Sequence, residues 1–260
     1  MTRIITALDF SDVTTASDFV SRIDPALTRL KVGNQLFTLG GPALIERFQA
    51  AGFDIFLDLK FHDIPNTVAA ALRAVSQLGV WMVTVHASGG PAMLEAARNA
   101  VSRLQPGNQA QGTRVIAVTV LTSQDRSDLK ATGLDLEPAD QVRCLARLAH
   151  SAELDGVVCS PQEVGMVREL ADRDFLVVTP GVRLKPESVH SNHTVVMQDG
   201  KPDDQRRTMS PGQAILAGSD YLVIGRPITQ SSSPVDMLRL LNKEVDAVAC
   251  ELSAGMNTLT

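Results

Sequence analysis

The chain has 260 residues, enough for one large α/β domain or two small ones, and a hydrophobic fraction of 44% that is ample for a sizeable core. A formal net charge of −5, with one Trp and one Tyr, is not typical of nucleic-acid binding, so no nucleic-acid partner is expected. No apolar run reaches the roughly 18 residues of a membrane span, and the amino terminus lacks a secretory signal, so we expect a cytoplasmic protein without a membrane partner.

The predicted elements alternate along the whole chain. Short apolar runs rich in β-branched residues predict eight strands, at Ile4–Leu8, Arg29–Val32, Ile55–Leu59, Trp81–His86, Arg114–Leu121, Gly156–Ser160, Phe175–Thr179 and Tyr221–Gly225. Segments of helical period predict helices at Pro42–Ala51, Thr67–Leu78, Ala92–Leu104, Ala139–Glu153, Gln162–Ala171, Pro211–Ala217 and Pro234–Ala249. No linker interrupts the alternation, so a single domain is expected over residues 1–260.

The alternation predicts the fold class. Near-continuous apolar strands separated by helices are typical of a parallel sheet covered on both faces. Eight such units in a chain of this length match an α/β fold of the (β/α)8 TIM-barrel type. A doubly wound open sheet is the alternative. Against it, no G-x-G-x-x-G follows the first strand, where Leu8-Asp9-Phe10 stands instead.

Neither the cysteines nor the histidines predict a disulfide or a metal site. Cys144, Cys159 and Cys250 are odd in number and far apart, and we expect them to be buried small apolar residues. Scattered spacing favours turn or surface roles over metal ligation for the histidines, which include His62, His86, His190 and His193. No metal is expected.

In a TIM barrel the functional side chains lie at the carboxyl ends of the strands. The predicted ends carry, in order, Asp9; Lys31; Asp58 and Lys60; His86; Thr122 and Ser123; Ser160; Pro180 to Arg183; and Gly225 with Arg226. A lone Asp, Ser or Thr there is as often a helix cap or a turn. The combination of Lys31, Asp58, Lys60 and Asp63 is more informative, because solvated charges usually lie on helices and not at a barrel mouth.

The last two strand ends predict a phosphate site, as is usual for this fold. Gly225 permits close approach of the backbone to an oxyanion, and Arg226 offers a planar fork suited to phosphate. After the seventh strand, TPGVR leads into a long polar stretch that ends in DDQRR. Loops of this length are more often lids than inert connectors. We expect a phosphate-gripping lid at residues 183–207, with Arg183 and Gln205 as its contacts.

Seven segments, in order, together resemble the bacterial-type orotidine 5′-phosphate decarboxylase family: ALD, LKVG, FLDLKFHDIPNT, TVLTS, VTPGVR, DQRR and YLVIGRPIT. The resemblance covers essentially the whole chain. It implies an enzyme that converts orotidine 5′-monophosphate to UMP and carbon dioxide in de novo pyrimidine biosynthesis. It further implies no cofactor, and a homodimer whose active sites are shared across the interface.

The resemblance also implies roles for individual residues. Lys60 would be the general acid that protonates C6, and Asp58 the carboxylate set against the carboxylate of the substrate. Lys31 and Asp63 would complete a Lys-Asp-Lys-Asp array, with Asp63 and Thr67 reaching the neighbouring subunit's site. The remaining implied contacts are Asp9 and Lys31 at the ribose; Thr122 or Ser123 at the pyrimidine; Pro180 in the substrate site; and Arg183, Gln205, Gly225 and Arg226 at the phosphate.

Two other functions are compatible with parts of this pattern. Keto-sugar-phosphate decarboxylases and aldolases share D-x-K-x-x-D and would use the acids to bind a divalent metal that stabilises an enediolate. Lys60 lies between those acids and competes for the position of the metal. The second alternative is a noncatalytic barrel that binds phosphoribosyl groups, but binding alone does not need four buried charges.

Overall fold

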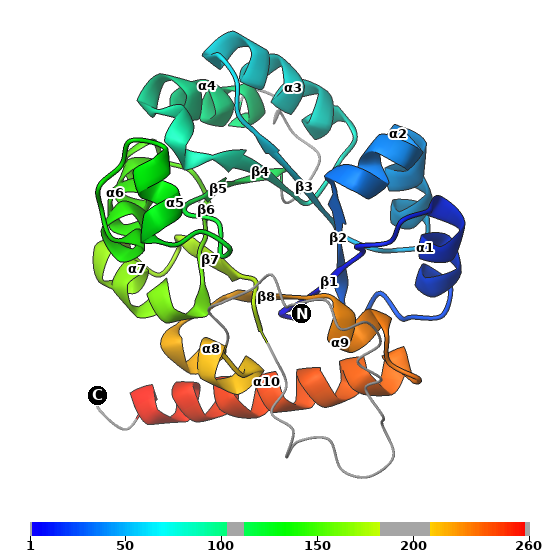
Figure 1. Ribbon diagram of the computed structural model, residues 1–260. Helices are drawn as coiled ribbons and strands as arrows, with labels where there is room; N and C mark the ends of the chain where they lie inside the picture. The colour runs from blue at the N-terminus through cyan, green and yellow to red at the C-terminus, as the bar shows by residue number, and fades with distance from the viewer. Residues whose placement is uncertain (1, 103–111, 183–208, 258–260) are drawn as a thin grey trace.

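The computed structural model describes residues 2–102, 112–182 and 209–257, and it has the predicted (β/α)8 architecture (Figure 1). Eight parallel strands form one closed barrel in chain order, and β8 returns to pair with β1. The strands are β1 (Ile4–Ala7), β2 (Arg29–Gly33), β3 (Ile55–Phe61), β4 (Met82–His86), β5 (Arg114–Val118), β6 (Gly156–Val158), β7 (Leu176–Thr179) and β8 (Tyr221–Ile224). The predicted strands are confirmed to within a few residues, and barrel closure excludes the open sheet.

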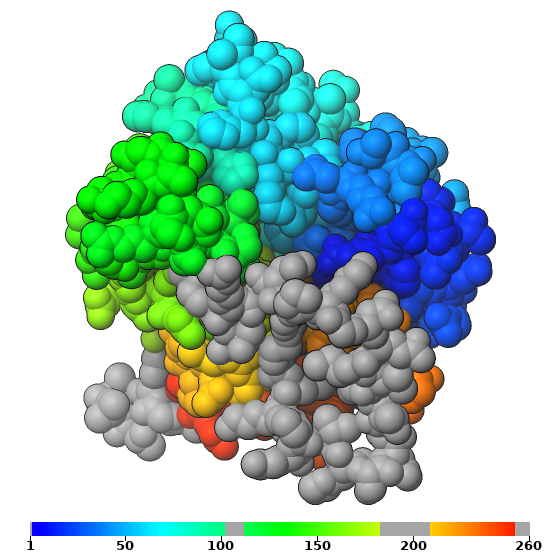
Figure 2. Space-filling view, in the orientation of Figure 1, coloured from blue at the N-terminus to red at the C-terminus, as the bar shows by residue number. Residues whose placement is uncertain are grey.

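Helices surround the barrel, and in the space-filling view α1 to α6 form a wall that runs from blue to green around this face (Figure 2). They are α1 (Val13–Val20), α2 (Asn34–Ala50), α3 (Pro65–Gln77), α4 (Pro91–Ser102), α5 (Arg126–Ala131), α6 (Pro138–Ser151), α7 (Val164–Leu170), α8 (Pro211–Ala217), α9 (Arg226–Thr229) and α10 (Pro234–Asn257). Helices α1, α5 and α9 were not predicted, and α9 has only four residues, too few for a clear helical period. None of the described helices is long and apolar enough to cross a membrane.

Helix α2 bends where the sequence places Gly41 and Pro42. Gly41 has φ +56°, which a residue with a side chain rarely adopts. Pro42 lacks the N–H that would continue the hydrogen bonds of the first segment. The helix predicted from Pro42 is therefore the second half of α2, and the first half begins directly after β2.

Two apolar layers hold the barrel together. One lies between the strands and the helices, and the other contains the alternate side chains Ile5 and Ala7 of β1. At the amino-terminal end of the barrel, the guanidinium carbon of Arg29 lies 4.4 Å from the ring centroid of Trp81 and 5.2 Å from that of Tyr221. These large side chains fill that end, which leaves the carboxyl ends of the strands for a functional site.

The prediction that all three cysteines are buried is wrong for two of them. Cys159 is buried directly after β6, but Cys144 on α6 and Cys250 on α10 are exposed. On α6 the inward positions are taken by residues such as Val142 and Leu145, and Cys144 lies outside this buried stripe and is exposed. An amphipathic helix buries one stripe only, so a cysteine off that stripe is exposed.

Candidate active site

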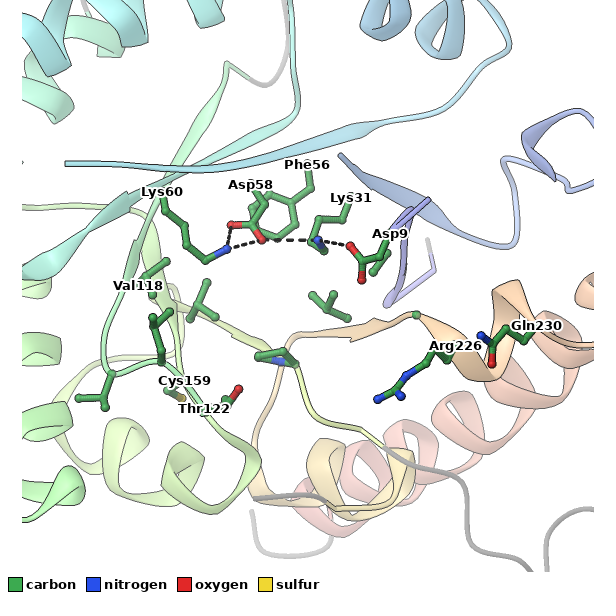
Figure 3. A pocket seen from close by; sticks show the side chains of 17 residues that line it. Asp9, Lys31, Phe56, Asp58, Lys60, Val118, Thr122, Cys159, Arg226 and Gln230 are labelled. Carbon is green, nitrogen blue, oxygen red and sulfur yellow. Dashed lines mark hydrogen bonds and ion pairs between the residues drawn. The ribbon is translucent and has the colours of Figure 1, made fainter. Parts of the chain in front are cut away.

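The carboxyl ends of the strands surround a cavity of about 520 Å³, seen from close by in Figure 3. Eight of the predicted site residues line it, and they come from six strand ends: Asp9, Lys31, Asp58, Lys60, Thr122, Pro180, Gly225 and Arg226. A closed parallel barrel brings all its carboxyl strand ends to one rim, which is why residues far apart in the sequence meet here.

Four charged side chains form a row along one wall of the cavity (Figure 3). Lys31 Nζ lies 3.2 Å from Asp9 Oδ1 and 3.6 Å from Asp58 Oδ2. Lys60 Nζ lies 2.8 Å from each of the two carboxylate oxygens of Asp58. Because Gly33 of β2 pairs with Asp58 of β3, the ends of these two strands lie side by side. The row therefore alternates in sign from Asp9 to Lys60.

Strand β3 is irregular where it carries the charges. Its pairing with β4 shifts register between Leu57 and Phe61, where four steps along β3 correspond to two steps along β4. Within this bulge, Lys60 has φ +52°, a conformation that non-glycine residues rarely adopt. Bulges of this kind re-aim side chains at strand ends. Here the side chains of Asp58 and Lys60 both reach the cavity.

Lys31 and Asp58 hold each other in their charged forms. Burial disfavours the charged ammonium of Lys31, but the carboxylates of Asp58 and Asp9 outweigh it and raise the pKa of Lys31. Burial likewise disfavours the Asp58 carboxylate. The charges of Lys31 and Lys60, with hydrogen bonds from Lys60 and Thr84, outweigh that effect and lower the pKa of Asp58. Both groups are therefore charged at neutral pH.

Asp63 and Thr67 are exposed and lie outside the lining of their own chain's cavity. Asp63 Oδ1 accepts a hydrogen bond of 2.6 Å from the backbone N–H of Ile64. Ile64 is 66% exposed, and Pro65 is the first residue of α3. The chain thus turns outward directly after the charged end of β3.

The rest of the cavity wall is mostly apolar. It is formed by Ala7, Phe56, Val118, Val120, Leu121, Val158, Cys159 and Val223. Of the two polar alternatives after β5, Thr122 lines the cavity and Ser123 is exposed. The apolar lining was not predicted from the sequence, because strand residues that face the core and strand residues that face a cavity are of the same apolar types.

The end of β8 forms another part of the wall. Gly225 is the N-cap of α9 and Arg226 is its first residue, and both line the cavity. Gln230, which was not predicted, lines it as well (Figure 3). Its spacing of four residues from Arg226 places both on one side of a helical turn, a signal that could have found it. Arg183, Gln205 and the rest of the predicted lid lie outside the described residues.

His86 and Ser160 end their strands without lining the cavity. The ring centroids of His86 and His62 lie 5.6 Å apart. Burial, and then electrostatic interaction with His62 and Lys60, lowers the pKa of His86. The backbone N–H of Ser160 donates a 2.9 Å hydrogen bond to the Glu163 carboxylate, as in a helix cap. Two further histidines lie outside the described residues: His190 and His193.

Comparison with known proteins identifies the family of the chain. The profile of the "Orotidine 5′-phosphate decarboxylase / HUMPS family" matches residues 2–241. An orotidine 5′-phosphate decarboxylase of Nitrosospira multiformis is 53% identical over 246 residues, which cover 95% of each chain. One of Chromobacterium violaceum is 50% identical over 93% of this chain and 91% of its own. The crystal structure of an orotidine 5′-phosphate decarboxylase from Lactobacillus acidophilus has a TM-score of 0.78 at 35% identity, covering 93% of this chain and 98% of that one. The chain therefore belongs to the orotidine 5′-phosphate decarboxylase / HUMPS family.

Proposed function

We propose that the chain decarboxylates orotidine 5′-monophosphate to UMP and carbon dioxide, a step of de novo pyrimidine biosynthesis. The observation that carries the proposal is the Lys60 ammonium, held 2.8 Å from both oxygens of Asp58 at the wall of the 520 Å³ cavity. Relatives about half identical over nearly the whole chain bear the name of this enzyme, which supports the same reaction.

Loss of carbon dioxide leaves an electron pair at C6 in an orbital that lies in the plane of the pyrimidine ring. Ring resonance does not delocalise this pair, so a fixed positive charge beside C6 is the effective stabiliser. In the proposed reaction the bond between C6 and the carboxylate breaks, and the electron pair stays on C6. Lys60 then donates a proton to C6 as general acid and regains one from solvent after product release. These steps need no electron sink and no cofactor.

The other side chains of the charged row hold the reactants in place. Asp58 orients the Lys60 ammonium and lies where the substrate carboxylate would approach, so their repulsion is relieved as carbon dioxide leaves. Asp9 and Lys31, 3.2 Å apart, are placed to bind the ribose hydroxyls. Thr122 is assigned to a hydrogen bond with the pyrimidine, beside the apolar wall.

The phosphate is assigned to the end of β8. The backbone of Gly225 and the guanidinium of Arg226 line the cavity, and a guanidinium matches phosphate oxygens in a bidentate fashion. Pro180, at the end of β7, is assigned to the same substrate site. On sequence grounds alone, Arg183 and Gln205 in the lid at 183–207 add further contacts. Binding energy from the phosphate can then offset the cost of orienting the reacting carbon.

A cytoplasmic homodimer with shared active sites is part of the proposal. It is supported by the exposure of Asp63 and Thr67, which lie next to the site in the sequence but outside their own cavity. In a two-fold dimer both copies use the same surface, so each site would receive Asp63 and Thr67 from its partner. The array would then combine Lys31, Asp58 and Lys60 of one chain with Asp63 of the other.

Turnover is expected to be independent of divalent metal. Lys60 donates to both Asp58 oxygens, so the ammonium holds the position that a metal would need. Loss of orotidylate absorbance, followed before and after exhaustive chelation, should show the same rate. Activity that disappears with the chelator and returns with magnesium would instead assign the chain to the keto-sugar-phosphate enzymes.

Arg226→Ala is expected to weaken binding of orotidylate, because it removes a charge-assisted contact to phosphate. Such contacts contribute roughly 1.5–3 kcal/mol, which corresponds to a KM higher by about 10- to 150-fold. Turnover of orotidine, which lacks the phosphate, should hardly change. Steady-state kinetics on both substrates make the comparison, with Arg147→Ala on the exposed side of α6 as the control. Equal losses on both substrates would contradict the phosphate role.

A further inference from the structure

The bulge of β3 faces a buried threonine on the neighbouring strand. Thr84 lies in the middle of β4 and is fully buried. It is the residue between the two β4 positions that pair with β3 on either side of the register shift. Its side chain does not line the cavity, so a direct contact with substrate is not its role.

The Thr84 hydroxyl makes two hydrogen bonds to the charged part of β3. Its Oγ1 accepts from the backbone N–H of Lys60 at 2.9 Å. The same Oγ1 donates to Asp58 Oδ1, also at 2.9 Å. A hydroxyl carries one donor hydrogen and two acceptor lone pairs, so both bonds form at the same time. One side-chain atom thus connects the backbone of Lys60 to the carboxylate of Asp58.

Both connected groups need external support. Lys60 has φ +52°, and a non-glycine residue keeps such a conformation only where its surroundings impose it. Its N–H bonds to a side-chain hydroxyl because the register shift interrupts the regular pairing of β3 with β4. The Asp58 carboxylate, for its part, could rotate about its terminal torsion, which is broad in carboxylates. The donor from Thr84 selects the orientation in which both oxygens accept from Lys60 Nζ.

We infer that Thr84 is a positioning residue for the reaction, which aims the Lys60 ammonium and the Asp58 carboxylate at the reacting carbon by holding the bulge of β3. The inference rests on the function proposed above. A threonine suits this place because it is β-branched, which favours a strand and restricts the side-chain rotamer that points the hydroxyl at β3.

Thr84→Val tests the inference, because it keeps the shape of the side chain and removes only the hydroxyl. Small misplacements of catalytic groups lower rates strongly, so kcat should fall roughly 10- to 100-fold. KM should stay within about threefold, since no substrate contact is removed. Thr84→Ser restores the hydroxyl and should recover most of kcat. The matched control is Thr6→Val, another fully buried strand threonine whose hydroxyl bonds to Thr28 Oγ1 at 2.8 Å and which does not line the cavity.

The outcomes separate the inference from the proposed function. An inactive wild-type enzyme would overturn both. An active wild type with an equally active Thr84→Val would overturn the inference alone, as would equal loss of kcat in Thr6→Val. Should Thr84→Val fail to fold by circular dichroism, Thr84→Ala tests the same hydroxyl without the branched methyl group. If neither variant folds while Thr6→Val does, Thr84 acts on folding and the positioning role is wrong.

Discussion

Lys60→Ala is expected to lower kcat/KM for orotidylate by at least about 10⁴-fold, because it removes general-acid catalysis and a preorganised charge together. Without the Lys60 ammonium, the electron pair that develops at C6 faces the Asp58 carboxylate, whose remaining cationic partner is Lys31 at 3.6 Å. The fold should persist, since the Lys60 side chain lies at the cavity wall and not in the core. Stopped-flow or steady-state absorbance gives the rate, and thermal unfolding checks the fold.

Two further variants test whether the loss of activity is specific to the Lys60 ammonium. Lys243→Ala, on the exposed side of α10, removes a lysine that does not line the cavity and should leave kcat/KM unchanged. Lys60→Arg keeps the charge but holds its proton too tightly to act as an acid, and its planar fork differs in shape, so it should be nearly as impaired as Lys60→Ala. If Lys60→Ala keeps more than about a tenth of the wild-type kcat, Lys60 is not the general acid.

A mixture of two inactive variants is expected to recover activity. Lys60→Ala and Asp63→Ala homodimers should each be severely impaired under the proposed dimer. Unfolding and refolding them together produces hybrids in which one site lacks both groups and the other has both. About half of the dimers are hybrids with one intact site each, so activity should rise to roughly a quarter of the wild-type value. The readout is specific activity against the fraction of hybrid, measured with differently tagged chains.

The matched control is a mixture of Lys60→Ala with Asp58→Ala. These two side chains lie 2.8 Å apart within one chain, so every hybrid site lacks one of them and no activity should return. If the Lys60→Ala and Asp63→Ala mixture stays inactive although hybrids have formed, Asp63 acts within its own chain and the shared site is wrong.

The barrel could be predicted because its signals are local. Each strand is a short apolar run and most helices have a full period, so the alternation can be counted along the chain without knowledge of contacts. The same count places Asp9, Lys31, Asp58 and Lys60 at successive strand ends, and barrel closure then puts them in one row. A helix as short as α9 was not predicted, because four residues do not complete a recognisable helical period.

The features that required three-dimensional packing depend on pairs of residues distant in the chain. Nothing near Lys60 in the sequence predicts its positive φ, which coincides with a register shift against β4 and a hydrogen bond to Thr84, 24 residues away. Similarly, the sequence predicts that Cys159 is buried but not whether it faces the core or the cavity. Only the curvature of the closed sheet makes it part of the cavity wall. The types of charge and their order along the chain are properties of the sequence. The direction in which each charged side chain points depends on how neighbouring strands pair, because strand register is set by contacts across the sheet and not by the residues of one strand.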